Sequence, residues 1–377
     1  MSCSVCAYIL IYIIIEYSVR KRCTLFHSVE RRNCMNIYDI SKMTGVSTAT
    51  VSRVINGSSN VSAKTREKVL SVIKEQGYTP NVFARGLGLN TMKTIGIMCT
   101  DSSDRYIAHA VYFLEESLRK QNYDMILCCT GYEHKEKEKQ MSMLLSKRVD
   151  AVILVGSSYA EENDELNSYI TDAAKTVPVM MVNGVINSPN VYSVVCDDYL
   201  AMYDCTRQML LSGRKCPLYI YNSLSYSGKK KMKGFMDAAG ELGVTDLESN
   251  MLYIPSHSTL SRRLSPSYIR SMIGEVFKKR SGYDSVICSE DVLAVGVLKY
   301  ASSAGLSVPK DLAVTGYNDS DLCECCEPEL TSVDNRLQAI CEKCVSSLME
   351  IFEGSKAVPK QTVFSCELIQ RSTTDFH

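Results

Sequence analysis

The sequence contains no apolar run long enough to span a lipid bilayer. The run at residues 7–15 has nine apolar residues, and Glu16 ends it. A membrane-spanning helix needs about 20 such residues. A secretory signal carries its positive charges before its apolar segment, whereas Arg20, Lys21 and Arg22 follow this one. The two absences disfavour a membrane protein and an exported protein, and they predict a cytoplasmic location.

Histidine is scarce, with five residues, and the seventeen cysteines have no disulfide-like spacing. In a long chain, scattered cysteines are typical of a reducing compartment, where thiols act as small core residues. Cys323, Cys325 and Cys326 form a C-x-C-C pattern, and Cys341 and Cys344 have helical i, i+3 spacing. Structural zinc sites use paired C-x-x-C ligands or nearby histidines instead. We therefore expect no metal and no cofactor.

A catalytic constellation is also missing. His109, His134 and His257 fall on different predicted elements, with no Gly-x-Ser-x-Gly turn and no His–carboxylate metal spacing. Gly228 and Gly234 do not have the spacing of a P-loop. An enzyme on an α/β scaffold would need a clustered acid, base or nucleophile. We expect no catalytic residues, and hence a protein that is not an enzyme.

Residues 36–89 have the pattern of three short helices followed by a hinge. Capping residues precede each predicted helix, namely Asn36 before Ile37–Thr44, Ser47 before residues 48–56 and Ser62 before residues 63–76. Apolar residues at helical spacing predict a small shared core of Ile40, Met43, Val46, Val51, Val54, Ile55, Val69, Leu70 and Ile73. Two helices joined by a glycine-containing turn form the helix-turn-helix layout, whose second helix enters the DNA major groove.

Charge separates this segment from the rest of the chain. Residues 36–93 hold eight basic and three acidic side chains, a net charge of +5. Residues 94–377 hold 29 basic and 37 acidic side chains, a net charge of −8. The overall charge of zero therefore hides a basic N-terminal module on an acidic remainder, as expected if only the first approaches phosphates.

An ordered series of motifs runs through the same segment: Asp39-Ile40, Gly45-Val46-Ser47, Thr50-Val51-Ser52-Arg53-Val54-Ile55-Asn56, Val61-Ser62, Thr65-Arg66, Gly77-Tyr78, Pro80-Asn81, Ala84-Arg85 and Leu87. This series resembles the DNA-binding head of LacI/GalR-type repressors. The resemblance implies that Thr48 and Ala49 read bases and that Arg53 reaches a base edge or a phosphate. Hydroxyl and amide side chains suited to phosphate oxygens are Ser47, Thr50, Ser52, Asn56 and Thr65.

The end of this segment resembles the hinge helix of that family. In it, Asn81 and Arg85 would contact DNA, and Leu87 would act as an apolar wedge in the minor groove. Gly86 and Gly88 flank this leucine, and each costs about 1 kcal/mol of helix stability relative to alanine. We therefore expect the hinge to become helical only on DNA.

From residue 94 the pattern alternates between strands and helices, which predicts parallel sheets covered on both faces. The first series has strands at residues 94–100, 123–129, 151–156 and 177–182, with helices at residues 107–120, 135–147 and 161–175. The second has strands at Pro217–Tyr221, residues 251–254, Ser285–Cys288 and residues 312–315, with helices at residues 231–242, residues 267–279, Asp291–Ala304 and Leu337–Phe352. Two series of this length predict two lobes.

This part of the chain also resembles the family, and the periplasmic sugar-binding proteins that share its two-lobed fold. The motifs are Val195-Cys196-Asp197-Asp198, Lys233-Gly234-Phe235, Asp291-Val292-Leu293-Ala294-Val295-Gly296, Val314-Thr315-Gly316-Tyr317-Asn318-Asp319 and Glu367-Leu368-Ile369-Gln370-Arg371-Ser372-Thr373. The first of them resembles the segment that crosses between lobes. The fold class expected is thus an all-α helix-turn-helix head and hinge, followed by a two-lobed, periplasmic-binding-protein-like α/β body.

Ligands of open α/β sheets bind at the carboxyl ends of strands, and two lobes place such ends around one cleft. The resemblance implies effector-binding positions at Asp101, Tyr106, Asn183, Lys231, Glu290 and Asn318. Sugar-binding relatives usually have aspartate where Asn183 and Asn318 stand and arginine where Lys231 stands. A sugar or sugar phosphate is the first expectation for the effector, a purine or other small metabolite the second, and a site that has lost its ligand the third.

The domains expected are a leader at residues 1–35 that does not fit this design, a helix-turn-helix domain at 36–80, a hinge at 81–93 and an effector-binding and dimerisation domain at 94–377. Met35 stands one residue before the first helix, which indicates a mis-assigned upstream start for the leader. We expect a repressor that binds a pseudo-palindromic double-stranded operator as a homodimer, without membrane association. The alternative is a membrane-anchored solute-binding receptor that uses the leader, which would give the basic head no purpose.

Overall fold

The computed structural model describes residues 35–55, 57–78, 91–255, 264–280 and 282–376. The chain forms two compact units, a head that ends at Met92 and a body that begins at Lys93. The leader predicted at residues 1–35 and most of the hinge predicted at 81–93 lie outside the described residues. In the part of the chain that is described, no helix is long and apolar enough to cross a membrane.

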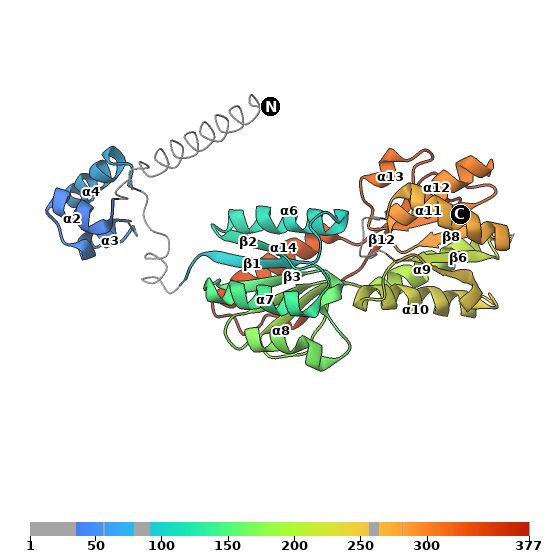
Figure 1. Cartoon of the computed structure of the whole chain (residues 1–377), viewed down its shortest axis with the longest axis horizontal. Helices are drawn as coiled ribbons and strands as arrows, with labels where there is room; N and C mark the ends of the chain where they lie inside the picture. Colours follow the sequence, from blue (N-terminus) through green and yellow to red (C-terminus); the bar gives the residue numbers. More distant parts are fainter. Residues whose placement is uncertain (1–34, 56, 79–90, 256–263, 281, 377) are drawn as a thin grey trace, which may run out of the picture. The chain divides into compact units, whose positions relative to one another are not determined.

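The head contains three helices, α2 (Ile37–Thr44), α3 (Thr48–Ile55) and α4 (Ala63–Glu75) (Figure 1). A capping box begins α2: the Asn36 side chain accepts a hydrogen bond from the Asp39 N–H, and the Asp39 carboxylate accepts one from the Asn36 N–H at 3.0 Å. Gly45 ends α2 at φ 66°, where glycine has no Cβ to strain. The Ser47 hydroxyl then caps α3 by accepting from the Thr50 N–H at 3.2 Å.

The core of the head contains fewer buried side chains than the sequence predicts. Its fully buried apolar side chains are Ile40, Val51, Val54 and Val69. Met43 and Leu70 were predicted to join them, but they are 49% and 47% exposed. The buried side chains of α2 are those of Ile40 and Thr44, one turn apart, and Met43 lies on the next face of the helix.

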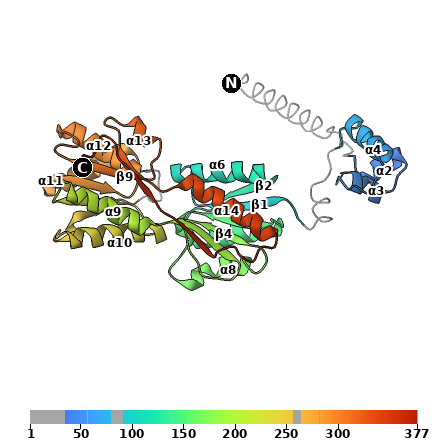
Figure 2. The ribbon, with the colours of Figure 1, turned by 180° about the vertical axis from the view of Figure 1, so that it is seen from behind.

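The first lobe of the body, lobe 1, is a six-stranded parallel sheet with strand order β11-β5-β4-β3-β1-β2. Its strands are β1 (Thr94–Cys99), β2 (Asp124–Cys129), β3 (Ala151–Val155), β4 (Val179–Val182), β5 (Val191–Cys196) and β11 (Gln361–Phe364). Helices α6 (Arg105–Lys120) and α14 (Leu337–Phe352) lie side by side on one face (Figure 2). Helices α7 (His134–Ser146) and α8 (Ser168–Ala173) pack on the other face.

The second lobe, lobe 2, is a six-stranded sheet with strand order β12-β10-β9-β8-β6-β7. Its strands are β6 (Pro217–Tyr221), β7 (Met251–Tyr253), β8 (Ser285–Cys288), β9 (Ala313–Tyr317), β10 (Thr331–Asp334) and β12 (Glu367–Ile369). Helices α11 (Pro266–Lys279) and α12 (Asp291–Ala304) cover one face. Helices α9 (Asp198–Leu211) and α10 (Tyr226–Glu241) cover the other. The short elements are η1 (Ser157–Tyr159), η2 (Asp164–Asn167), η3 (Leu247–Asn250) and α13 (Leu322–Cys325).

The chain crosses between the lobes at three places, from β5 to α9, from β10 to α14 and from β11 to β12. The C-terminal helix α14 therefore belongs to lobe 1, although both the strand before it and the last strand belong to lobe 2. Three parallel connections allow the lobes to rotate about the crossing segments while each lobe keeps its own core.

Two expectations about the body are wrong. The helix predicted at residues 161–175 is replaced by η2 and the short helix α8. The sheets were expected to be parallel, but β12 pairs with β10 in the antiparallel direction. β12 comes directly after the crossing from β11 of lobe 1. The chain therefore enters the sheet of lobe 2 at the end where the other strands leave it.

Candidate functional site

One face of α3 is directed away from the core of the head. Val51 and Val54 are buried, whereas Ala49 and Arg53, one turn apart, are exposed. Thr48, at the start of the helix, and Ser52, between the two faces, are half-buried. The helix therefore presents short side chains at its N-terminal end and a guanidinium one turn later, the face that the sequence assigns to DNA contacts.

Hydroxyl pairs mark the N-terminal ends of α3 and α4. The Ser47 and Thr50 hydroxyl oxygens lie 2.9 Å apart. In α4, the Ser62 hydroxyl donates to the Thr65 hydroxyl at 2.9 Å and accepts from the Thr65 N–H at 3.3 Å. Helix N-termini carry partial positive charge, so these hydroxyls stand where phosphate oxygens are bound favourably.

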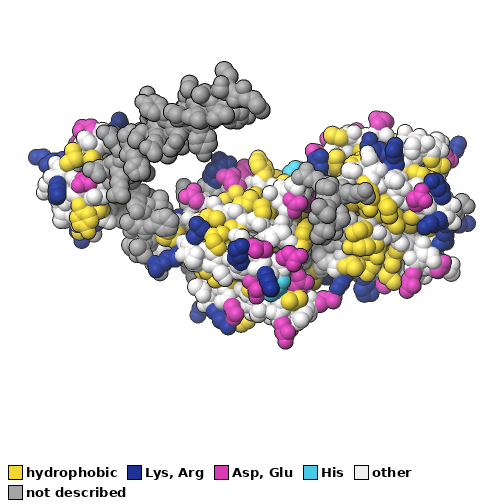
Figure 3. Space-filling view, in the orientation of Figure 1, with side chains coloured by type: hydrophobic (Ala, Val, Ile, Leu, Met, Phe, Trp, Pro, Cys, Tyr) yellow, Lys and Arg dark blue, Asp and Glu magenta, His cyan; other side chains and the backbone are white. Residues whose placement is uncertain are grey.

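The described part of the head is basic. It holds six basic side chains, Lys42, Arg53, Lys64, Arg66, Lys68 and Lys74, against three acidic ones, Asp39, Glu67 and Glu75. Lysine and arginine side chains are spread over its surface in Figure 3. Arg66 differs from the others because it is half-buried and donates to the Ser58 carbonyl, which fixes the loop before α4. Four positions predicted to contact DNA, Asn56, Asn81, Arg85 and Leu87, lie outside the described residues.

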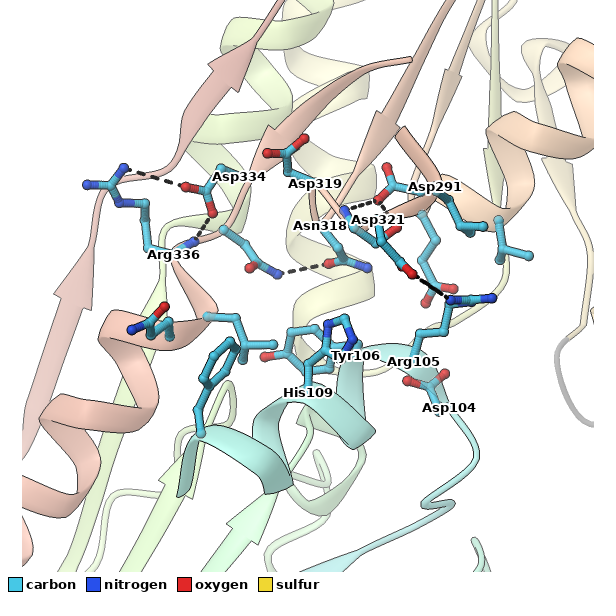
Figure 4. Close-up of a pocket in the computed structure, with 18 of the residues that line it drawn as sticks. Asp104, Arg105, Tyr106, His109, Asp291, Asn318, Asp319, Asp321, Asp334 and Arg336 are labelled. Carbon is cyan, nitrogen blue, oxygen red and sulfur yellow. Dashed lines mark hydrogen bonds and ion pairs between the residues drawn. The ribbon is translucent and has the colours of Figure 1, made fainter. Parts of the chain in front are cut away.

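The body contains a cavity of about 810 Å³ between its lobes. Lobe 1 contributes the segment that leads into α6, and lobe 2 contributes the loops after β8 and β9 (Figure 4). Four of the six predicted effector-binding residues line it: Asp101, Tyr106, Glu290 and Asn318. Asn183 and Lys231 lie behind its wall.

Asn183 supports Tyr106 from the interior of lobe 1. Its side-chain amide donates to the Tyr106 hydroxyl, and its carbonyl oxygen accepts from the Cys196 N–H at 3.3 Å. Burial raises the pKa of Tyr106 well above its usual value, so the phenol stays protonated. The amide thus links a side chain of the cavity wall to the first crossing segment, which begins after Cys196.

Lys231 is buried in lobe 2, with 7% of its surface exposed. Its ammonium donates to the Ser289 carbonyl at 3.3 Å and lies 3.9 Å from the Asp198 carboxylate. It also lies 3.6 Å from the centroid of the Tyr317 ring, whose hydroxyl donates to Asp198 at 2.7 Å. A buried ammonium needs such partners, and here they fix α10 to the start of α9 and to β9.

Glu290 carries the most perturbed carboxyl group of the cavity wall. Burial, and then the charge of Asp104 from the opposite lobe, raise its pKa to about 7. Lys231 and a hydrogen bond with Asn222 act in the opposite direction. Near neutral pH this side chain therefore exists in both protonation states, and it can both donate and accept hydrogen bonds.

Asn318 stands at the end of β9 with a positive φ of 100°. Its side-chain oxygen accepts from the Asn335 amide at 2.8 Å, which joins the cavity wall to the second crossing segment. The two lobes are joined across the cavity by an ion pair, in which Arg105 of lobe 1 donates to Asp321 of lobe 2 at 3.2 Å (Figure 4).

The cavity is also lined by four residues that the sequence did not assign to it, namely Arg105, His109, Asp321 and Arg336. Arg105 and His109 share one face of α6 with Tyr106 nearby, so helical spacing around a predicted site residue was the available signal. Arg105 pairs with Asp321, and Arg336 pairs with Glu367 as well as with the nearby Asp334. Asp321 and Glu367 come from distant segments, which spacing does not reveal.

The cysteines suspected of metal binding are divided between the lobes. Cys323 belongs to the core of lobe 2, whereas Cys341 and Cys344 belong to the core of lobe 1. Among the residues that the structure describes, no three His, Cys, Asp or Glu side chains are grouped to hold a metal ion. The buried thiols serve as small apolar core groups.

A basic helix-turn-helix head followed by a two-lobed body with a ligand-sized cavity defines a DNA-binding transcriptional regulator. Residues 36–81 match the family model of bacterial regulatory proteins of the lacI family, and residues 217–374 match a periplasmic binding protein-like domain. An HTH-type transcriptional regulator of Lachnoclostridium phytofermentans is 49% identical over 344 residues, 91% of this chain and all of the relative. The chain belongs to the lacI family.

More distant relatives and solved structures are also similar to this chain. The HTH-type transcriptional repressor PurR of Haemophilus influenzae is 29% identical over 83% of this chain and 90% of its own. The crystal structure of the lac repressor dimer bound to operator and the anti-inducer ONPF is similar in fold, with a TM-score of 0.79 and 21% identity. The alignment covers 90% of this chain and 98% of the lac repressor chain. A complex of the regulator CelR with cellobiose gives a TM-score of 0.65 and 24% identity.

Proposed function

We propose that this protein is a repressor that binds a pseudo-palindromic operator as a homodimer in the cytoplasm and is controlled by a small molecule bound between its lobes. The carrying observation is the cavity of about 810 Å³, whose walls come from both lobes and connect to the crossing segments. A ligand that contacts both walls changes the equilibrium between lobe arrangements, and with it the spacing of two heads in a dimer. The relatives are transcriptional regulators, which leaves the membrane-anchored receptor without support.

DNA contacts are assigned to the exposed face of α3 and the N-terminal ends of α3 and α4. The residues are Ser47, Thr48, Ala49, Thr50, Ser52, Arg53 and Thr65, together with Asn56, Asn81, Arg85 and Leu87 from the sequence. The exposed position of Arg53 and the hydroxyl groups at two helix N-termini support this assignment. Short side chains at Thr48 and Ala49 suit apolar contact with a thymine methyl group.

The effector is a neutral, polyhydroxylated molecule, and a free sugar fits better than a sugar phosphate. The described wall contains eight carboxyl groups, on Asp101, Asp104, Glu290, Asp291, Asp319, Asp321, Asp334 and Glu342. Both of its arginines, Arg105 and Arg336, are already paired with carboxylates. A phosphate would add negative charge next to these groups, whereas hydroxyl groups can donate hydrogen bonds to them.

Selection from a random duplex library tests the proposed DNA recognition. The full chain is bound to the library at a stated salt concentration, and the retained duplexes are sequenced. One pseudo-palindrome with a central pyrimidine–purine step is the expected product, because such steps are easily kinked. Retention without sequence preference that disappears on raising the salt would show a head that merely coats DNA, and the repressor proposal would fall.

A thermal-shift series tests the effector class. Free mono- and disaccharides are compared with their phosphates and with purines. Each compound is added to the wild-type protein and to the Asp101→Asn variant, which changes one polar group of the wall. A neutral sugar should raise the melting temperature, and the variant should reduce that shift. Stabilisation by phosphates alone would contradict the charge argument.

A further inference from the structure

Two thiols meet at the ends of neighbouring strands in lobe 1. Cys99 is the last residue of β1 and Cys129 the last residue of β2, and the two are directly paired in the parallel ladder. Their sulfur atoms lie 3.7 Å apart. Cys99 is fully buried, whereas Cys129 is exposed at the edge strand of the sheet. The pair thus combines one accessible thiol with one protected thiol.

The strand geometry allows these sulfur atoms to bond. Directly paired residues project to the same face of a sheet, and neighbouring strands lie about 4.8 Å apart. A disulfide needs a Cα separation of about 4.4–6.8 Å, so adjacent strands satisfy it without a shift of the backbone. Cys128, by contrast, projects to the opposite face and is buried in the other core of lobe 1. Of Cys128 and Cys129, only Cys129 is placed to form a disulfide with Cys99.

We propose that Cys99 and Cys129 form a reversible modification site, which a hydroperoxide oxidises to a disulfide in the folded protein. The Cys129 thiolate attacks a peroxide oxygen and becomes a sulfenic acid, while the O–O bond breaks and the other oxygen leaves as hydroxide, which is protonated to water. The Cys99 sulfur then displaces the sulfenic oxygen, which leaves with the Cys99 proton as a second water. Two thiols and one hydrogen peroxide thus give one disulfide and two waters.

The protonation of the pair agrees with this order of events. Burial, followed by the charge of Cys129, raises the pKa of Cys99 to about 12, so this sulfur remains a thiol near neutral pH. The exposed Cys129 is therefore the first to react. Cys99 resolves the sulfenic acid by passing its proton to the sulfenic oxygen as its sulfur attacks, a step that the raised pKa slows and the 3.7 Å separation favours.

The site lies beside the cavity without being part of its wall. The residues that follow the two cysteines remain paired, because the Thr130 N–H donates to the Cys99 carbonyl at 2.8 Å and the Gly131 N–H to the Thr100 carbonyl at 2.9 Å. The same two segments carry Asp101 and Tyr132 into the cavity. A disulfide would therefore restrain two segments of the wall, and its formation can be measured without any effector.

Peptide mapping tests the proposal directly. The full chain is treated with hydrogen peroxide while folded, alkylated under denaturing conditions and digested with trypsin. Cys99 is the only cysteine of the tryptic peptide 94–105, and Cys128 and Cys129 lie in the peptide 121–135. We expect a cross-linked 94–105/121–135 species that dithiothreitol separates. Oxidation of other thiols without this species would overturn the proposal.

Four variants assign the sulfur atoms. Cys128→Ala should keep the cross-link and Cys129→Ser should abolish it; a link that survives in Cys129→Ser would identify Cys128 as the partner and refute the assignment. Cys99→Ala should leave a sulfenic acid on Cys129 that dimedone labels, and loss of that label would refute the stepwise route. Cys325→Ser, which removes an exposed thiol in lobe 2, is the matched control and should not change the yield of the cross-link.

Discussion

Individual side chains of the cavity wall are held by partners from other segments rather than by their own helices. Tyr106 is supported by Asn183 and Asn318 by Asn335, and behind the wall the buried Lys231 is held by Asp198 and Tyr317. Each partner lies on or next to a segment that crosses between the lobes. These contacts connect the wall to the crossings, and we expect a change at the wall to reach the crossings through them.

Replacement of Glu290 by glutamine should remove a pH dependence of stability. The pKa of Glu290 in the folded protein, about 7, exceeds its ordinary value of 4.5. Between these values the folded protein binds more protons than the unfolded chain, so this group lowers the free energy of unfolding as pH rises from about 4.5 to about 7. Above pH 7 the variant should be more stable by on the order of 1–2 kcal/mol, a value reduced because the side chain is only half-buried.

Urea denaturation of both proteins between pH 5 and pH 8 measures this difference. Glu342→Gln, which alters an exposed carboxyl group of the same wall, is the control and should show no such trend. If the free energy of unfolding of Glu290→Gln changed with pH in parallel with that of the wild type, the pKa of the Glu290 carboxyl group would not be raised in the folded protein.

Replacement of Arg53 by alanine should weaken operator binding by about 1–3 kcal/mol without loss of stability, because the side chain is exposed and is proposed to reach a base or phosphate. Fluorescence anisotropy at several salt concentrations measures the operator affinity of the wild type and of the variant. If the contact is to a phosphate, the salt slope also falls by about one. Lys74→Ala, at the far end of α4, is the control. Equal effects of the two variants would show that Arg53 has no specific role.

At the scale of elements, the close packing of α9 against α10 depends on a glycine. A Cβ at Gly234 would overlap the Tyr199 carbonyl oxygen and lie 2.9 Å from the Tyr203 nitrogen, and both atoms belong to the backbone of α9. The two helices would have to separate. This contact lies beside the buried group of Lys231, Asp198 and Tyr317, so it also positions the crossing into lobe 2.

Gly234→Ala should therefore destabilise the body by a few kcal/mol, as overpacked core sites do. Gly240→Ala in the same helix is the matched control, because its Cβ would lie at an ordinary 3.8 Å from Leu247. That change should be neutral or stabilise by up to about 1 kcal/mol. Thermal unfolding of the two variants distinguishes them, and similar melting temperatures would contradict the packing argument.

Much of this element structure was predictable because local signals determine it. The caps and the glycine turn predicted α2 to the residue, and apolar periodicity predicted α12 and α14 to the residue. The strands β5, β10, β11 and β12 were not predicted as strands, since each follows or precedes a crossing and the last three have only three or four residues. The depth of Lys231 behind the cavity was also unpredictable, because it depends on Asp198 and Tyr317 from other elements.

At the scale of the whole body, the cavity opens between two lobes that have separate cores. The direct contact described across its mouth, Arg105 with Asp321, is an exposed ion pair. Lys229 of lobe 2 and Glu162 of lobe 1 form a second exposed ion pair, and the Ser157 and Ser225 hydroxyls form a hydrogen bond between the lobes. Exposed pairs contribute little to stability, so we expect a ligand that binds both walls to change the relative arrangement of the lobes. We expect this rearrangement and operator binding to be coupled.

Reciprocal titration tests the coupling between the cavity and operator binding. The operator found by selection is titrated with the full chain in the presence and absence of the stabilising sugar, and the sugar is titrated with and without the operator. Thermodynamic linkage requires the two affinities to change by the same factor, and we expect a factor of about 5–150. If neither ligand changes the affinity for the other, the cavity does not control DNA binding, and the proposed coupling between the lobes and the head is wrong.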